Sequence, residues 1–172
     1  MYQDYKDLLS AFQSHGVKYL VVGGFAVIFH SQPRFTKDMD VFIKADPENA
    51  KAIYAALVGF GAPLQGIRPE DFTDRNSFFR FGRDPNGFDI LPAIPGVDFD
   101  AAWERRVETV VDTATGLKAN FISADDLIAS KLASGRARDL ADVEDIRNAA
   151  ESQLPRPANK QPPEPAQSGP GR

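Results

Sequence analysis

The sequence of 172 residues contains no cysteine and only two histidines, His15 and His30. The lack of cysteine excludes disulfide bonds and thiolate zinc sites, and it leaves the redox compartment open. Because the two histidines are scattered, neither a histidine general base nor a histidine-ligated zinc site is expected.

Long apolar runs are also absent. No run approaches the roughly 20 residues that a helix needs to cross a bilayer. The residues after Met1 lack the basic and apolar regions of a secretory signal. We therefore expect a cytoplasmic protein that makes no membrane contact.

The chain has no excess of positive charge. Its net charge is −4, and residues 153–172 contribute +2, so residues 1–152 carry −6. An acidic body argues against general electrostatic adhesion to nucleic acid, which requires a basic surface. It does not exclude an RNA end that is held by a few local arginines.

The length and composition suit one domain with a substantial core, because 42% of the residues are hydrophobic and 26% are charged. Six of the thirteen prolines follow residue 154, among residues that are otherwise small or polar. Such a segment cannot bury enough apolar surface to order itself. We therefore predict a single domain over residues 1–152 and a proline-rich, disordered tail over residues 153–172.

The most informative stretch is residues 18–44, KYLVVGGFAVIFHSQPRFTKDMDVFIK. Residues 18–22 are apolar and β-branched after the lysine, which predicts a strand buried on both faces. Gly23-Gly24 allows a sharp turn and a close approach of the backbone to a bound group. A helix over residues 25–30 would point its N–H groups at that turn, which is a natural phosphate site. Taken alone, the two glycines are better explained by an ordinary strand-to-helix turn.

A second strand over residues 36–44 would place Asp38 and Asp40 on one face, with their α-carbons roughly 7 Å apart. Two like charges in that arrangement are destabilising without a cation. They suit a site in which two divalent ions about 4 Å apart hold a phosphoryl group. An exposed strand that alternates acids with apolar residues, or the Asp-x-Asp metal site of a glycosyltransferase, would give the same pattern.

A third acid, Asp89, lies in a predicted hairpin. Residues 77–81 and 88–91 flank Asp84-Pro85-Asn86-Gly87, which is a strong turn signal. Asp89 stands between Phe88 and Ile90, and an acid in such an apolar strand requires an explanation.

Charged residues also gather near the end of the domain. Ser123 is a plausible cap for a helix over residues 125–134, in which Leu127, Ile128 and Leu132 would face the core. A last helix over residues 139–150 would turn Leu140, Val143 and Ile146 inward. In the plain interpretation Lys131 is solvated, while Asp139 and Asp142 stabilise the start of the last helix through its dipole.

The glycine pair, a spacer of thirteen residues and Asp38-Met39-Asp40 together resemble the signature of the DNA polymerase β-type nucleotidyltransferases. The run from Arg34 to Asp40, RFTKDMD, resembles their AbiEii-like toxin branch. The resemblance implies an α/β (α+β) fold, with a small mixed sheet flanked by helices, and two bound Mg²⁺ ions with Mn²⁺ as an alternative. It also implies the transfer of a nucleoside monophosphate from an NTP to an acceptor.

The resemblance assigns roles to individual residues. Asp38, Asp40 and Asp89 would be the catalytic residues and metal ligands. A lysine and an Arg-x-Lys-Asp-x-x-Asp run complete the family's site, and this chain has Arg138 at the position of the run's lysine. The nucleotide would be bound by Gly23, Gly24, Arg34, Thr36, Lys131 and Asp139.

The acceptor that the resemblance suggests is tRNA, for a toxin with an antitoxin protein as its partner. Relatives that modify antibiotics or proteins share the first motif. A non-catalytic nucleotide-binding or partner-binding module of the same fold, and more distantly a sugar-nucleotide enzyme, are the competing hypotheses.

Overall fold

The computed structural model describes residues 1–83 and 85–154. Residue 84 of the predicted hairpin turn and residues 155–172 lie outside the described part. The prediction of a disordered tail falls on those residues, except that Gln153 is the last residue of a helix. In the described part of the chain, no helix has the length and apolar character to cross a membrane.

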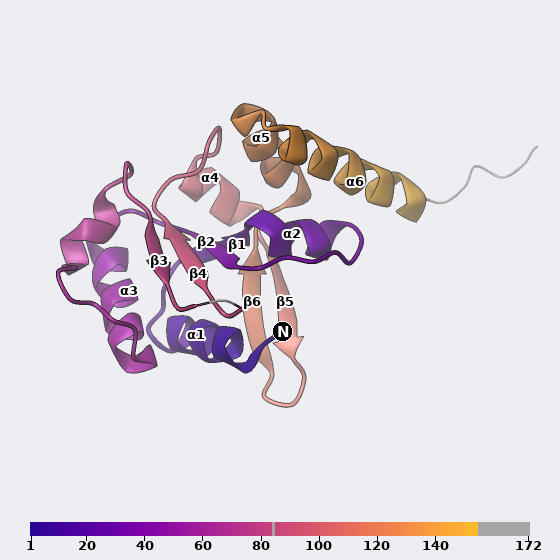
Figure 1. The fold of residues 1–172 in the computed structure, drawn as a ribbon. Coiled ribbons are helices and arrows are strands. Elements are labelled where there is room, and N and C mark those ends of the chain that lie inside the picture. Colours follow the sequence, from indigo (N-terminus) through magenta and orange to yellow (C-terminus); the bar gives the residue numbers. More distant parts are fainter. Residues whose placement is uncertain (84, 155–172) are drawn as a thin grey trace, which may run out of the picture.

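Helices and strands form a mixed α/β structure, as the sequence predicts (Figure 1). The helices are α1 (Gln3–Ser14), α2 (Gly23–His30), α3 (Pro47–Phe60), the 3₁₀ helix η1 (Pro69–Thr73), α4 (Phe99–Glu104), α5 (Ala124–Ser134) and α6 (Ala137–Gln153). The strands are β1 (Tyr19–Val22), β2 (Met39–Ile43), β3 (Phe79–Phe81), β4 (Phe88–Leu91), β5 (Val107–Asp112) and β6 (Leu117–Phe121).

The strands form one six-stranded mixed sheet in the order β3-β4-β2-β1-β6-β5. Strand β2 pairs antiparallel with β1 and parallel with β4. The predicted hairpin is present, because β3 pairs antiparallel with β4, and β5 pairs antiparallel with β6 in a second one. In the β2–β4 register Asp40 lies directly beside Asp89. The topology therefore brings two predicted site residues together from positions 49 residues apart in the sequence.

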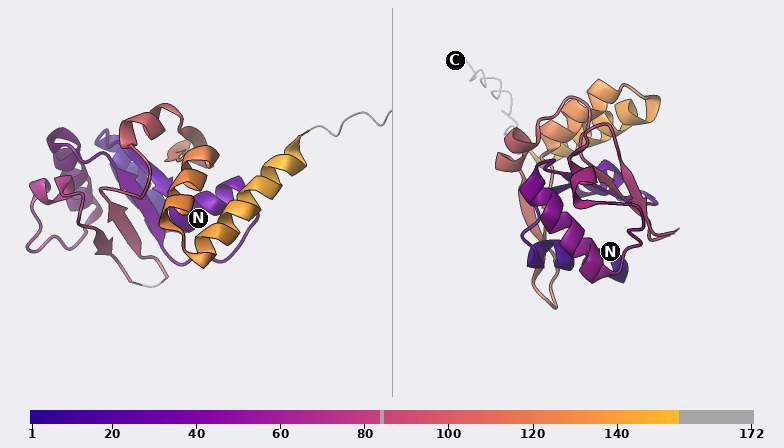
Figure 2. Two further views of the ribbon diagram at one scale, coloured as in Figure 1. Left: turned by 90° about the horizontal axis from the view of Figure 1, so that it is seen from above. Right: turned by 90° about the vertical axis from the view of Figure 1, so that its left-hand side faces the viewer.

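Helices cover both faces of the sheet. Phe12 of α1 packs on Tyr19 of β1, whereas Phe99 of α4 packs edge-on against Phe42 of β2. Tyr19 pairs with Ile43, so Phe42 points to the opposite face. Helix α3 lies with α1, and the pair α5–α6 lies on the other side of the sheet (Figure 2). The face that carries Asp40 is therefore the one approached by α5.

Local sequence signals set the ends of α5. The Ser123 hydroxyl accepts a hydrogen bond from the Asp126 N–H at 3.2 Å, which confirms the predicted cap. Gly135 ends the helix with a left-handed backbone at φ +69°. This tight connection allows α6 to fold back against α5.

Three details differ from the sequence-based expectation. Strand β2 begins at Met39 rather than at residue 36, and Asp38 lies in the bend before it. Leu132 and Leu140 are 47% and 46% exposed, so they do not face the core. On α5 the inward stripe instead contains Leu127 and Lys131, four residues apart.

Candidate active site

A cavity of about 510 Å³ opens where the start of α2, the acids of β2 and β4, and the α5–α6 pair meet. It contains all the residues that the sequence assigned to the site, and we call it the charged cavity. Its lining consists of Gly23, Gly24, Arg34, Phe35, Thr36, Lys37, Asp38, Asp40, Arg80, Asp89, Lys131, Arg136, Arg138, Asp139 and Asp142.

The three carboxylates predicted to be catalytic are among the five aspartates that line this cavity. Asp89 is 8% exposed, and Asp40 lies beside it on the neighbouring strand. Burial, followed by the charges of Asp89 and Asp38, raises the pKa of Asp40 to about 6, although Arg80 and Lys131 act in the opposite direction. The Asp40 anion is therefore disfavoured mainly by its burial and secondly by the two neighbouring acids.

Arg80 is a site residue that the sequence did not reveal. It lies opposite Asp89 in the β3–β4 register and donates to both Asp89 oxygens, from Nε at 2.8 Å and from Nη2 at 2.8 Å. Its side chain is 64% exposed, so it can turn into solvent. In the sequence, only the pairing register of the predicted hairpin would have indicated that Arg80 lies opposite Asp89.

The two glycines allow the backbone to approach other site residues closely. Gly23 begins α2 with φ +60°, and a Cβ there would overlap the Asp40 carboxylate. A Cβ at Gly24 would overlap the Thr36 hydroxyl. No side chain caps the N-terminus of α2 at Val22. The first N–H groups of the helix are therefore available to an anion in the cavity.

Replacing Gly23 by alanine should abolish function while costing moderate stability. The matched control is Gly16→Ala, because Gly16 has nearly the same φ, +64°, but nothing within 4 Å of its would-be Cβ. Both variants should lose about 1–2 kcal/mol from the left-handed backbone. Only Gly23→Ala should also displace Asp40 and lose the nucleotidyl transfer that the sequence resemblance implies. Urea unfolding measures the stability of both variants, and the transfer of labelled nucleotide from an NTP to an acceptor measures their activity. Equal activity in the two would contradict the prediction.

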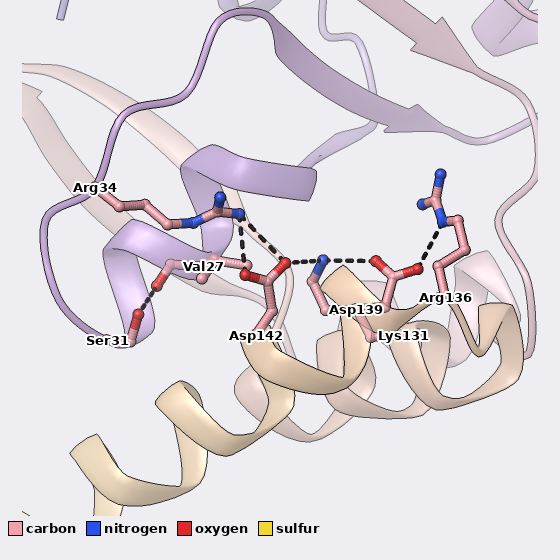
Figure 3. A network of polar contacts seen from close by, with 7 residues as sticks. All are labelled: Val27, Ser31, Arg34, Lys131, Arg136, Asp139 and Asp142. Atoms are coloured by element: carbon pink, nitrogen blue, oxygen red, sulfur yellow. Dashed lines mark hydrogen bonds and ion pairs between the residues drawn. The ribbon is translucent and has the colours of Figure 1, made fainter.

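Lys131 is buried, which corrects the prediction of a solvated lysine. Its Nζ donates to Asp142 at 2.7 Å and to Asp139 at 3.2 Å, and the residue is 8% exposed (Figure 3). Arg34 donates to Asp142 from the loop after α2, and Arg136 donates to Asp139 at 2.7 Å. The network thus joins the loop that carries Thr36 to both C-terminal helices.

The electrostatics of Asp139 follow from this network. Burial by itself raises the pKa of its carboxyl, but hydrogen bonds from Arg136, Ser134 and Lys131 outweigh that effect and hold the pKa below its usual value. Asp139 therefore stays ionised and keeps Lys131 in place.

Tyr5 supports the backbone of the site from α1, a role that the sequence did not indicate. Its buried hydroxyl donates to the Gly87 carbonyl at 2.9 Å, and the same carbonyl accepts the Met39 N–H at 3.1 Å. A Cβ at Gly87 would lie 2.9 Å from an oxygen of Asp38. Tyr5 therefore fixes the backbone on which Asp38 rests.

The three acids offer the hard oxygen donors that Mg²⁺ prefers. Among residues 1–83 and 85–154, no three acidic or imidazole side chains are already gathered around one point. Asp89 instead directs both oxygens at Arg80. Burial and two neighbouring acids disfavour the Asp40 anion, and a bound cation would offset both effects. The donor set therefore fits a divalent ion, provided that Asp89 turns away from Arg80.

Comparison with known proteins identifies the fold and the family. No curated protein matches the chain significantly. Among solved structures, the lincosamide antibiotic adenylyltransferase LnuA with bound lincomycin superposes with a TM-score of 0.54 at 16% identity, over 87% of this chain and 98% of that chain. At this identity the likeness shows a shared nucleotidyltransferase fold. The model of the family described as "Nucleotidyltransferase of unknown function (DUF6036)" matches residues 3–155, and the chain belongs to this family.

Proposed function

We propose that this enzyme, an NTP-dependent nucleotidyltransferase by its family, uses Mg²⁺ held by Asp38, Asp40 and Asp89 to transfer a nucleoside monophosphate to an acceptor hydroxyl. The observation that carries the proposal is the charged cavity, which combines three acids with an uncapped helix N-terminus. A bound Mg²⁺ pair would stabilise the charge on the attacking and leaving oxygens.

The reaction is an in-line displacement at the α-phosphorus. The acceptor oxygen forms a bond to this phosphorus, the bond from it to the oxygen bridging the β-phosphate breaks, and pyrophosphate leaves with the electron pair. Asp89 lies on β4, opposite Arg80 of the edge strand β3, and takes the acceptor's proton. The N–H groups of Gly23 and Gly24 bind the β- and γ-phosphates, and Lys131 balances charge on the departing pyrophosphate.

For the acceptor we propose the end of a tRNA, in a toxin controlled by an antitoxin. Two features support an RNA end. The RFTKDMD run resembles the AbiEii-like branch, and Phe35, 83% exposed, lies among the cations of the cavity rim. Exposed aromatic rings beside cations suit unpaired nucleotides. An antibiotic hydroxyl is the second candidate, because LnuA, whose name describes an antibiotic adenylyltransferase, shares the fold over most of the chain.

The test is a labelling assay. The purified protein is incubated with each α-³²P-labelled NTP and Mg²⁺, together with total tRNA, with lincomycin or with protein acceptors, and with EDTA in parallel. Label on one acceptor class that disappears with EDTA and in Asp38→Asn supports the proposal. Label on none of these acceptors, from a protein that still binds NTP and metal, would favour a non-catalytic module.

Arg80→Gln should strengthen binding of divalent metal. The guanidinium competes with a metal ion for both Asp89 oxygens. Because the Arg80 side chain is 64% exposed, water screens the pair and limits its contribution to about 1 kcal/mol. Its removal should lower the Kd for Mn²⁺ about fivefold. Calorimetric titration of Mn²⁺ into the nucleotide-free protein measures this.

The control for this variant is Arg68→Gln, because Arg68 is a similarly exposed arginine that pairs with Asp71 away from the cavity. Its Mn²⁺ affinity should match that of the parent. Unchanged affinity in Arg80→Gln would mean that Asp89 does not contribute to the metal site.

A further inference from the structure

A second cavity, also of about 510 Å³, adjoins the charged cavity. The two share a boundary that consists of Gly23, Asp40, Lys131, Arg136 and Asp139. Beyond this boundary the second cavity has a different chemistry. Its remaining lining is Val22, Leu91, Ile94, Pro95, Leu127, Ser130 and Ser134. We call it the apolar cavity.

The walls of the apolar cavity are held by close packing. On one side stands α5, and on the other the loop that follows β4. Ile94 and Val97 form an isolated bridge across the turn of this loop. Gly96 has φ +69°, and a Cβ there would lie 2.8 Å from the Ala133 Cβ of α5. The loop therefore lies directly on the helix and closes one end of the cavity.

The in-line geometry of the reaction indicates which part of the substrate lies in this cavity. In an in-line displacement the attacking and leaving oxygens lie on opposite sides of the α-phosphorus. The nucleoside, attached through its 5′ oxygen, leaves that line sideways. Asp40 belongs to both cavities, so a nucleotide whose α-phosphate lies near Asp40 can extend its nucleoside past Lys131 into the apolar cavity.

The chemistry of the lining agrees with that occupant. A triphosphate is strongly anionic and fits the charged cavity. A base and ribose present flat apolar faces with a few polar edges, which suits apolar walls with isolated hydroxyls. The Ser130 hydroxyl lines the cavity and has no hydrogen-bond partner among the described residues. It is therefore able to bind a ribose hydroxyl or a base edge.

We infer that the apolar cavity between α5 and residues 91–97 binds the nucleoside of the NTP, while the charged cavity binds its triphosphate and receives the acceptor. This inference rests on the proposed function, because it names the subsite for the donor of that reaction.

The test separates nucleoside binding from phosphate binding. Ser130 lies on a partly exposed helix face, so Ser130→Trp should fold and fill the cavity. Calorimetry in Mg²⁺ compares a non-hydrolysable α,β-methylene NTP with inorganic tripolyphosphate. Ser130→Trp should weaken NTP binding at least tenfold and leave tripolyphosphate binding unchanged. Ser152→Trp, an exposed helix serine away from both cavities, should change neither.

Three other outcomes would overturn the inference. Unchanged NTP binding in Ser130→Trp places the nucleoside elsewhere, and acceptor labelling by the parent would then keep the proposed function intact. Unchanged NTP binding with a raised KM for the acceptor assigns the apolar cavity to the acceptor. If the parent binds NTP no better than tripolyphosphate and labels no acceptor, the proposed function itself fails.

Discussion

Asp40→Asn should reduce nucleotidyl transfer by about a thousandfold while leaving a folded protein. The substitution keeps the shape of the side chain but removes a charged oxygen of the proposed metal site, at the position where the two cavities meet. Losing such a ligand costs the transition state several kcal/mol, at about 1.4 kcal/mol for each factor of ten. The labelling assay with Mg²⁺ measures the loss.

The same variant should be more stable than the parent in the absence of metal. Burial and the charges of Asp89 and Asp38 raise the pKa of Asp40 to about 6, so the folded protein disfavours the ionised form. The unfolded chain releases this proton near pH 4, which is the ordinary value for aspartate. The contribution of Asp40 to the stability of the parent should therefore fall as the pH rises from about 4 to about 6 and then level off.

Asparagine cannot titrate, so Asp40→Asn lacks this decline, and above pH 6 it should exceed the parent by about 1–2 kcal/mol in the free energy of unfolding. Urea unfolding in EDTA from pH 4 to 8 tests this. The control is Asp145→Asn, which removes an exposed acid of α6 and should follow the parent in both assays. If Asp40→Asn labels the acceptor as well as the parent does, the Asp38–Asp40 pair takes no part in catalysis and the metal proposal fails.

The local parts of the fold were predictable because local chemistry determines them. The glycine pair, the Ser123 cap and the turn of the predicted hairpin each specify a backbone conformation over a few residues. Asp89 was also found from the sequence, because an acid between two buried apolar residues requires a partner. Its position next to Asp40 came from the family resemblance, since strand order depends on contacts far apart in the chain.

The residues that were missed depend on such distant contacts. Arg80 is an ordinary strand residue until the hairpin register places it opposite Asp89. Tyr5 follows the apolar stripe of α1, and only the fold carries its hydroxyl to Gly87. On α5, three apolar residues suggested an inward face that includes Leu132. In the structure, Asp139 and Asp142 of α6 pair with Lys131. The stripe of α5 that contains Lys131 is therefore buried, rather than the stripe that contains Leu132.

Because Lys131 is buried, its replacement should affect both stability and catalysis. Lys131→Met leaves Asp139 and Asp142 each with a single arginine partner, Arg136 and Arg34. Removing one member of a buried charge network costs about 3–5 kcal/mol, and the remaining arginines should reduce this to about 2–3 kcal/mol at pH 7. Lys118→Met, which breaks an exposed pair with Glu108, should change stability by less than about 1 kcal/mol.

The pH dependence of this loss follows from the acids that Lys131 holds. The pKa of Asp139 is lowered in the folded protein, so its ion pairs stabilise the fold above about pH 4, and this stability is lost as the pH falls through the folded value. The difference between the parent and Lys131→Met should therefore shrink below pH 4. Urea unfolding between pH 3 and 7 measures it.

A double variant separates the structural role of Lys131 from its catalytic one. In Lys131→Met/Asp139→Asn the surplus buried charge is gone. Arg136 loses its carboxylate partner, but its side chain is 77% exposed, so water can solvate the guanidinium at little cost. The double variant should regain at least half of the free energy of unfolding that Lys131→Met loses. Nucleotidyl transfer should stay about a hundredfold below the parent, because a buried cation near Asp40 is still missing and water cannot replace it. If activity recovers together with stability, Lys131 serves only to hold α5 and α6 together, and the charge on the leaving pyrophosphate must be balanced by another residue.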